Sequence, residues 1–169
     1  EVISEYTGES LAESERQESE IGARWGNGAA IINEIRMVNG EGSRTRSFTT
    51  GDRVRVEIDY TANRQLEETV FSLRFTSLHG TEIWAANSKR RREFIHQLKP
   101  SGTAVVEIPR LPLLEGSYDL TAIITDQTER KVYDWWDKRI RFDVTSGSNF
   151  DEGLVTVEST WDMSGARIS

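Results

Sequence analysis

Residues 51–60 read Gly-Asp-Arg-Val-Arg-Val-Glu-Ile-Asp-Tyr, and their apolar and charged side chains alternate without interruption from Arg53 onward. An alternation with a period of two is typical of a β-strand that packs one face on a core and turns the other face to water. The pattern recurs along the chain and predicts a sandwich or barrel with polar, solvent-facing sheets. Such a face either keeps the protein soluble or binds a polar ligand.

Short strands are predicted between glycine-, proline- and asparagine-containing turns, with no long helix between them. They are Ala29–Val38, Ser47–Thr50, Arg53–Thr61, Thr69–Leu78, Glu82–Asn87, Thr103–Ile108, Ser117–Thr125, Arg139–Thr145 and Leu154–Trp161. The segment from Lys89 to Leu98 is compatible with a helical turn. The number and spacing of the strands predict an all-β fold, an antiparallel β-sandwich.

The composition limits the possible partners. The chain has 169 residues, enough for one domain with a core, and a formal net charge of -7. An acidic balance argues against nucleic-acid binding, because no surplus of Lys and Arg is present to neutralise phosphates. The chain contains no cysteine, which fits a reducing compartment and excludes thiolate metal sites. No apolar run approaches the roughly 20 residues that span a bilayer.

Residues 1–23 differ from the rest, because they are rich in Glu, Ser and Gln and poor in large apolar side chains. Such a segment buries too little surface to offset the entropy of ordering it. We therefore expect an acidic linker at 1–23, with transient helix from Ser10 to Ile21, and a β-sandwich domain at 24–169. The sequence starts at Glu1 without a basic, apolar signal segment, so it reads as a piece of a longer protein.

Five short motifs follow one another in a recognisable order. They are Arg24-Trp25-Gly26-Asn27-Gly28-Ala29-Ala30-Ile31, Phe48-Thr49-Thr50-Gly51-Asp52, Ile108-Pro109-Arg110-Leu111-Pro112-Leu113-Leu114-Glu115-Gly116-Ser117-Tyr118, Tyr133-Asp134-Trp135 with the later Phe142-Asp143-Val144, and Gly153-Leu154-Val155 running on to Trp161. In this order they resemble the C-terminal carbohydrate-binding domain of the Wzt-type ATP-binding subunit of O-antigen polysaccharide ABC transporters. The resemblance covers about residues 24–162.

The resemblance implies an immunoglobulin-like β-sandwich that follows a nucleotide-binding domain and recognises the modified non-reducing end of a lipid-linked polysaccharide before export. It also implies a homodimer that exchanges its last strand and, through the full-length protein, contact with a membrane permease subunit. The expected location is the cytoplasmic, inner face of the bacterial inner membrane. The chain carries no Gly-x-x-x-x-Gly-Lys-Ser/Thr P-loop, so no ATP site and no cofactor are expected in it.

The candidate carbohydrate-binding residues come from the strand patterns and lie on polar faces or beside them. Asp59 and Thr76 are expected beside Arg74 on one polar face. The full set is Arg74, Thr76, Asp59, Trp84, Asn87 and Trp136. Arg74 interrupts a strand of apolar and small residues, and its rigid fork of donors suits sugar hydroxyls or a terminal phosphate. The alternative for these charged residues is a cross-strand ladder of ion pairs.

Aromatic rings stack on the apolar faces of sugars, and the chain has five tryptophans. Trp25, Trp135 and Trp161 are expected in the core. Adjacent residues of a strand point to opposite faces, so only one of Trp135 and Trp136 can face the core, and Trp136 is taken as the surface ring. Trp84 is equally compatible with stacking and with packing.

The C-terminal segment Leu154–Trp161 has an alternation of its own and follows the flexible connection Ser146-Gly147-Ser148-Asn149, so it is the segment expected to exchange in a homodimer. Two other function classes remain open. One is a protein–protein assembly domain without glycan binding, and the less favoured one is a glycan-modifying hydrolase. The basic run Lys89–Arg92 is compatible with phosphate binding or with a solvated loop, and neither His79 nor His96 has metal-ligand spacing.

Overall fold

The computed structural model describes residues 22–90 and 95–168, and within them the chain forms ten β-strands and no helix. The strands are β1 (Arg24–Trp25), β2 (Ala30–Asn39), β3 (Ser47–Thr49), β4 (Val54–Ala62), β5 (Glu67–Ser77), β6 (Glu82–Asn87), β7 (Ile95–Gln97), β8 (Ser101–Ile108), β9 (Gly116–Thr125) and β10 (Val132–Thr145). The predicted all-β fold is confirmed. The predicted transient helix at Ser10–Ile21 lies outside the described residues.

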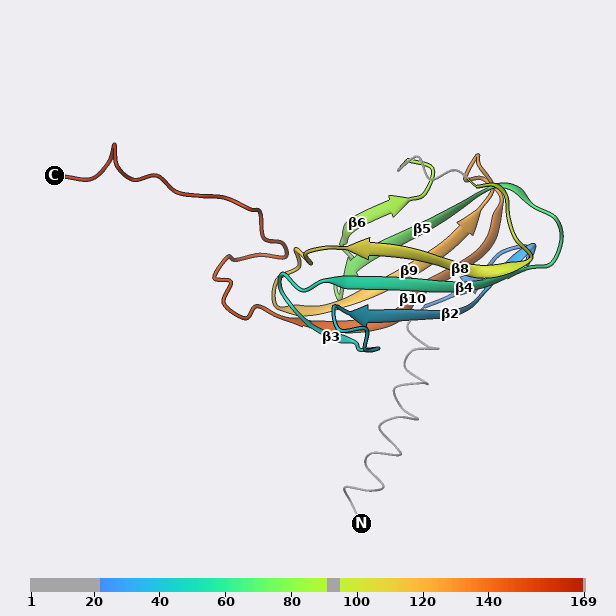
Figure 1. Ribbon diagram of the computed structural model, residues 1–169, viewed down its shortest axis with the longest axis horizontal. Coiled ribbons are helices and arrows are strands. Elements are labelled where there is room, and N and C mark those ends of the chain that lie inside the picture. The colour runs from blue at the N-terminus through green and yellow to red at the C-terminus, as the bar shows by residue number, and fades with distance from the viewer. Residues whose placement is uncertain (1–21, 91–94, 169) are drawn as a thin grey trace, which may run out of the picture.

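The strands form two sheets that pack face to face (Figure 1). Sheet A has the order β1-β10-β9-β5-β6, with β3 parallel to β10 and β7 antiparallel to β5. Sheet B has the order β2-β4-β8, and its neighbours are antiparallel. The consecutive strands β4 and β5 therefore lie in different sheets, which is the arrangement of a β-sandwich.

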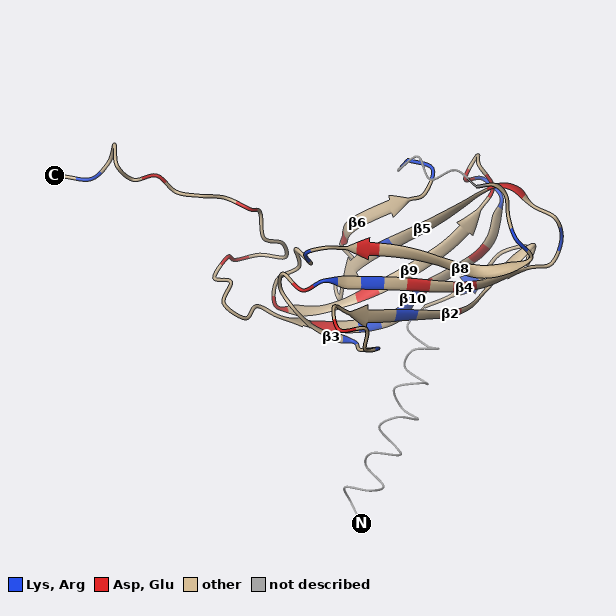
Figure 2. Cartoon of the chain, viewed as in Figure 1, with Lys and Arg blue, Asp and Glu red and all other residues tan. Residues whose placement is uncertain are grey.

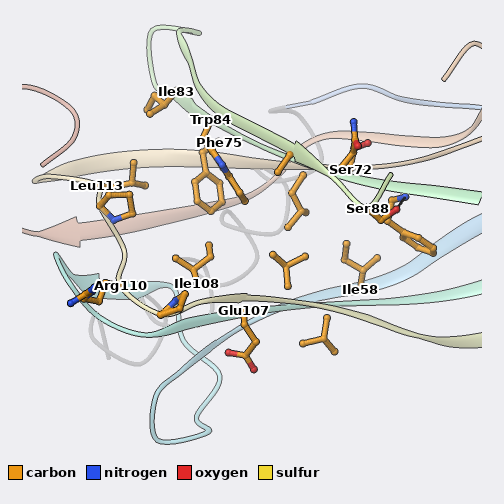
Figure 3. A pocket seen from close by; sticks show the side chains of 18 of the residues that line it. Ile58, Ser72, Phe75, Ile83, Trp84, Ser88, Glu107, Ile108, Arg110 and Leu113 are labelled. Atoms are coloured by element: carbon orange, nitrogen blue, oxygen red, sulfur yellow. Dashed lines mark hydrogen bonds between the residues drawn. The ribbon is translucent and has the colours of Figure 1, made fainter. Parts of the chain in front are cut away.

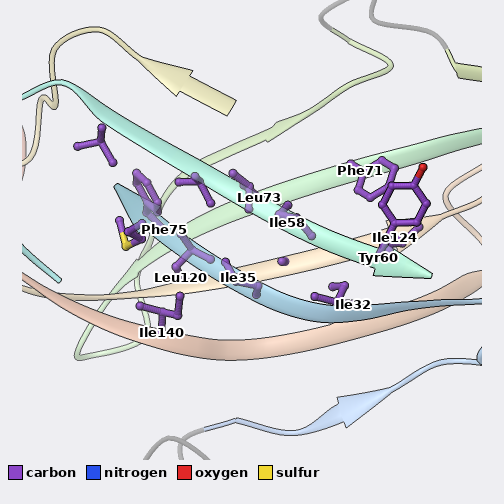
Figure 4. Close-up of a cluster of buried hydrophobic side chains, with 14 of the residues drawn as sticks. Ile32, Ile35, Ile58, Tyr60, Phe71, Leu73, Phe75, Leu120, Ile124 and Ile140 are labelled. Carbon is purple, nitrogen blue, oxygen red and sulfur yellow. The ribbon is translucent and has the colours of Figure 1, made fainter. Parts of the chain in front are cut away.

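The core fills the space between the inner faces of the two sheets. Inward-facing side chains from both sheets meet there (Figure 4); among them are Ile32, Ile35, Ile58, Leu73, Leu120, Ile124 and Ile140. In β4 the predicted alternation is confirmed, because Val54, Val56, Ile58 and Tyr60 are buried while the charged residues between them are not. Burying a side chain of this size contributes about 1.5–3 kcal/mol.

Phe142 on β10 lies at the centre of an aromatic cluster and is 1% exposed. Its ring centroid lies 5.3 Å from that of Phe75, 5.7 Å from that of Tyr118 and 6.3 Å from that of Phe48. The Tyr118 hydroxyl donates a hydrogen bond to the Leu114 carbonyl over 2.6 Å. A buried tyrosine bonded to a carbonyl a few residues upstream also occurs in immunoglobulin-like sandwiches.

The first family motif fixes the chain where it enters the sandwich. The Arg24 guanidinium makes two hydrogen bonds to the Asp134 carboxylate, of 3.0 and 2.7 Å, and a third to the Ile32 carbonyl. Asp134 also accepts a hydrogen bond from the Ile32 N–H over 2.8 Å and is 5% exposed. These bonds join β1 and β10 of sheet A to β2 of sheet B.

Gly26 has a φ of +145°, and a Cβ at this position would lie 2.3 Å from the Tyr133 carbonyl oxygen. We expect Gly26→Ala to lower the free energy of unfolding by about 1–3 kcal/mol from backbone strain alone, with the clash adding to it. Gly42→Ala is the control, because Gly42 has a φ of +84° and no atom within 4 Å of a Cβ. Urea denaturation should show a larger loss for Gly26→Ala, and equal losses would contradict this prediction.

The structure differs from the predicted strands in four places, the first of which is β1, where no strand was predicted. β10 begins at Val132 rather than Arg139, and the segment predicted as a possible helical turn contains β7 in its described part. The predicted strand Leu154–Trp161 is wrong, because it forms only an isolated bridge between Val155 and Leu113. Beyond that bridge the chain extends away from the sandwich (Figure 1).

Candidate functional site

Basic and acidic residues lie along the strands of sheet B (Figure 2), and on its outer face they form a ladder of ion pairs. The Arg36 guanidinium contacts Glu34, Glu57 and Asp59, and Arg53 and Arg55 share Glu107 on β8. The neighbouring charges raise the pKa of Arg36 above its ordinary value, chiefly through the hydrogen bond to Asp59. This face is the cross-strand ladder named above as the alternative, and its charges satisfy one another.

Asp59 belongs to this ladder and does not lie beside Arg74. Hydrogen bonds from Arg36 and then from the Thr103 hydroxyl hold the pKa of the Asp59 carboxyl below its ordinary value. The expectation that Asp59 and Arg74 share a face is wrong, because β4 lies in sheet B and β5 in sheet A. Alternation assigns a residue to the outside of its strand but does not say to which sheet the strand belongs.

The outer face of sheet A carries different chemistry, since indole rings stand among the polar groups. Residues paired in register share a face, so the pairing aligns three rows across the strands. The first row is Trp25, Trp135, Ile123, Ser72 and Asn87, the second is Thr121, Arg74 and Ala85, and the third is Arg141, Asp119, Thr76 and Glu82. We call the part formed by Trp25, Trp135, Arg74 and Asp137 the Trp–Arg face.

Trp135 is the centre of the Trp–Arg face. Its ring stacks on that of Trp25, with centroids 4.8 Å apart and an interplanar angle of 18°. The Arg74 guanidinium carbon lies 4.8 Å from the Trp135 ring centroid. Trp25 comes from β1 and Arg74 from β5, so the two reach Trp135 from opposite sides of β10. Trp25 is 46% exposed, which leaves a large apolar ring surface open to solvent.

Among the described residues, Arg74 makes one ion pair, to Glu82 over 3.2 Å, and both side chains are partly exposed. An exposed pair of this kind contributes about 0–1 kcal/mol, so a ligand can displace Glu82 at little cost. Arg74 is also held over Trp135 by the attraction between a cation and an aromatic ring. Its fork of donors is therefore positioned beside an exposed aromatic surface.

Three of the six candidate residues lie on this outer face. Arg74 and Thr76 lie two residues apart on β5, and Asn87 is paired with Ser72 at the edge of the sheet. The Asn87 side chain is engaged within the protein, because it donates to Glu129 over 3.0 Å and accepts from the Arg90 N–H. Arg74 and Thr76 are thus the better placed of the three.

The two tryptophans chosen as stacking rings do not belong to this outer face. Trp84 is paired with Phe75 and packs on it, with ring centroids 4.9 Å apart. Trp136 is paired with Ala122 and packs against the core. The guanidinium carbons of Arg24 and Arg139 lie 3.8 and 4.6 Å from its ring centroid. Only one ring of the Trp135–Trp136 pair faces outward, as predicted, but that ring is Trp135.

The expectation that Trp25, Trp135 and Trp161 pack in the core is wrong. Trp25 is 46% and Trp161 85% exposed, and Trp135 is half-buried on the outer face. Trp25 and Trp135 are the site residues that the sequence analysis missed. The adjacent tryptophans indicate that one of the two rings points outward. The sequence does not tell which one, because bulges in β10 break the alternation from which it could be read.

An apolar cavity of about 1000 Å³ opens between the free edges of the two sheets, β6 and β8 (Figure 3). Phe75 and Trp84 line it from sheet A, Ile58 and Ile108 line it from sheet B, and Val155 of the C-terminal segment also contributes. An open apolar surface of this kind marks a place where another group packs. It is chemically distinct from the Trp–Arg face.

The described residues contain no group of three or more His, Cys, Asp or Glu side chains that could hold a metal ion. In the same part of the chain, no helix has the length and apolar character required to cross a membrane.

Together these features define the protein as a β-sandwich domain whose larger sheet exposes stacked indoles and an arginine. The chain belongs to the Wzt C-terminal domain family, whose model matches residues 22–157. The family resemblance seen in the sequence motifs is thereby confirmed.

Among solved structures, the chain is similar to the crystal structure of the C-terminal domain of Wzt, with a TM-score of 0.73 and 20% identity, over 83% of this chain and 87% of that chain. At this identity the similarity shows the fold. A CARDB domain from Pyrococcus furiosus matches with a TM-score of 0.35 and 10% identity, over 68% of this chain and 96% of that chain, which is too distant to support an argument. No curated protein matches the chain.

Proposed function

We propose that this domain is a non-catalytic module that binds the non-reducing terminal region of a lipid-linked O-antigen polysaccharide for export by an ABC transporter. The observation that carries the proposal is the Trp–Arg face in a member of the Wzt C-terminal domain family. In this role the chain works at the cytoplasmic side of the bacterial inner membrane, joined through the full-length subunit to a permease.

The chemistry of the Trp–Arg face supports glycan binding. A pyranose ring has an apolar face that stacks on an indole, and Trp25 offers an exposed ring for it. The hydroxyl groups around the sugar ring need donors and acceptors, which Arg74, Thr76 and Asp137 supply. Sites that combine an apolar surface with a few placed polar groups are typical of small-ligand binding. Recognition of this kind requires no catalytic group.

The C-terminal segment favours assembly into a homodimer as a second part of the same function. Val157 is 70%, Trp161 85% and Phe150 92% exposed. We propose that this segment packs into the apolar cavity between β6 and β8 of a second copy, where it would also cover two free sheet edges. Residues Leu154 and Thr156 hydrogen-bond to Leu114 and Pro112 of their own chain, so the exchanged part begins after Thr156.

Arg74 and Arg53 allow a matched test of the binding face, because each forms an exposed ion pair with one glutamate among the described residues. Arg74→Ala is expected to weaken binding of the cognate polysaccharide terminus by about 1–3 kcal/mol, because a charged hydrogen bond is lost. Arg53→Ala, on the outer face of sheet B and paired with Glu107, should leave binding unchanged. Titration calorimetry of the whole 169-residue chain with the terminal oligosaccharide measures both.

Trp135→Ala is expected to reduce binding at least as much as Arg74→Ala, since it removes the ring that holds both Trp25 and Arg74. If Arg74→Ala and Trp135→Ala bind the oligosaccharide as the parent chain does, the site lies elsewhere. If no glycan binds the parent chain at all, the domain is an assembly module, the alternative function that its exposed C-terminal segment supports.

A further inference from the structure

Asp137 stands at an irregular point of β10 that shapes the Trp–Arg face. Between the pairs Trp136–Ala122 and Ile140–Leu120, β10 contains three residues where β9 contains one. Lys138, in the middle of this bulge, has a φ of +47°, which is strained for a residue other than glycine. Bulges and strained residues of this kind persist where the surroundings fix them, and they cluster at binding sites.

Hydrogen bonds donated by two backbone N–H groups hold the bulge, and they do not involve the Asp137 carboxylate. The Lys138 N–H donates to the hydroxyl of Thr121, which is 1% exposed, and the Asp137 N–H donates to the Ala23 carbonyl. The Asp137 carboxylate accepts two long hydrogen bonds on Oδ1, from the Thr121 hydroxyl over 3.3 Å and from the Trp135 indole N–H over 3.4 Å. Within the described residues, Oδ2 accepts none.

The arginines of this outer face, by contrast, already have carboxylate partners. Arg74 pairs with Glu82, and Arg141 makes a bidentate pair with Asp119, over 2.9 and 3.2 Å. A Cβ added to Gly22 would lie 3.3 Å from the Lys138 Cβ, so this part of the bulge lies beside the residues that lead into β1. The face therefore presents paired guanidinium groups together with an open carboxylate oxygen beside the Trp135 ring.

We infer that Asp137 is a specificity-determining residue that makes the Trp–Arg face select an uncharged, hydroxyl-bearing terminal sugar over one that carries a phosphate or a carboxylate. A sugar hydroxyl donates a charge-assisted hydrogen bond to Oδ2 while the ring stacks on an indole. An anionic group at the same place meets the like charge of the Asp137 carboxylate and cannot donate a hydrogen bond to Oδ2. This inference rests on the proposed glycan binding at the same face.

The test compares matched ligands and matched variants. The probes are pairs of immobilised oligosaccharides of identical sequence that end either in a hexopyranose or in its 6-phosphate, and pairs that end in a hexose or the corresponding hexuronic acid. The proteins are the parent chain, Asp137→Asn, which keeps the shape and an acceptor oxygen, and Glu107→Gln, which removes a carboxylate from the outer face of sheet B. Thermal unfolding checks that each variant is folded.

The parent chain should prefer the uncharged member of each pair. Asp137→Asn should bind that member about 10-fold more weakly, because a hydrogen bond to a charged group becomes one to a neutral group. Asp137→Asn should bind the phosphorylated or carboxylated member at least as tightly as the parent chain does. The preference for the uncharged member should therefore become smaller. Glu107→Gln should behave like the parent chain.

Three results would overturn the inference. If the parent chain prefers the anionic member of each pair, the inference is wrong, although the proposed glycan binding still holds. An Asp137→Asn variant with an unchanged preference would show that another residue sets the specificity. A parent chain that binds no oligosaccharide would overturn the proposed function, and the inference would fall with it.

Discussion

A chain that ends at Thr156 is expected to be monomeric at concentrations at which the 169-residue chain is dimeric. It keeps the two hydrogen bonds that tie Leu154 and Thr156 to their own sandwich, so the fold should survive. It loses Val157 and Trp161, which are largely exposed in the single chain. Each side chain of this kind contributes about 1.5–3 kcal/mol when fully buried, and a symmetric exchange buries each one twice. The dimer should therefore weaken by about four orders of magnitude or more.

Size-exclusion chromatography with light scattering measures this difference directly. Trp161→Ala is a milder variant that should raise the dimer dissociation constant without changing the unfolding temperature of the monomer. Asp162→Ala, next to it in the sequence, is the control for a change outside the apolar positions. A full chain that is monomeric at every concentration, or a shortened chain that still forms dimers, would rule out exchange through this segment.

Replacing Asp134 by alanine is expected to destabilise the domain by about 2–4 kcal/mol. The change leaves the Ile32 N–H without its acceptor in a buried place, and it leaves Arg24 without its counter-ion. The cost stays below that of a fully buried pair, because the Arg24 side chain is 37% exposed and water can reach it. The midpoint of urea unfolding, followed by tryptophan fluorescence, gives the magnitude.

Asp134→Ala should also affect the Trp–Arg face, because Arg24, which Asp134 holds, is next to Trp25 in β1. Without Asp134, β1 keeps its short pairing with β10 and the hydrogen bond from Arg24 to the Ile32 carbonyl, but it loses two bonds, and the stack of Trp25 on Trp135 should loosen. Asp143→Ala is the matched control: Asp143 lies on the same strand but is exposed, so its loss should change stability by about 0.5 kcal/mol or less. Equal effects of the two variants would show that the bonds around Asp134 do not anchor β1.

The sequence predicts regular strands well and irregular ones poorly. The alternation in β4, and in β5 from Phe71 onward, marks the inner face of each strand, since nothing interrupts the period of two there. β10 is recognised only from Arg139 onward, because two register shifts between Val132 and Ile140 break the alternation. β1 is two residues long, which is too short for any period to appear. The C-terminal alternation does not give a strand, because in the described part of the chain this segment pairs only through the isolated bridge from Val155 to Leu113.

The candidate site was predicted only in part for the same reason. Arg74 and Thr76 are recognisable as outward residues from β5 alone. Their neighbours come from β1 and β10, at positions set by a bulge and by strand order, and neither of these is visible in a periodic pattern. Asp59 was wrongly grouped with Arg74 because consecutive strands were assumed to share a sheet. Tertiary arrangement, rather than local pattern, decides which polar residues meet.

β1 has a mechanical consequence for the domain. It is the first described strand, and a pull on the chain before Arg24 reaches the sandwich through its two residues. The pairing of β1 with Trp135 and Trp136 and the bonds to Asp134 then resist this force. They would break one after another rather than all together. A sugar held against Trp25 adds contacts to the strand that would peel first. By mass action, occupancy of the Trp–Arg face would raise the force needed to detach this end of the domain.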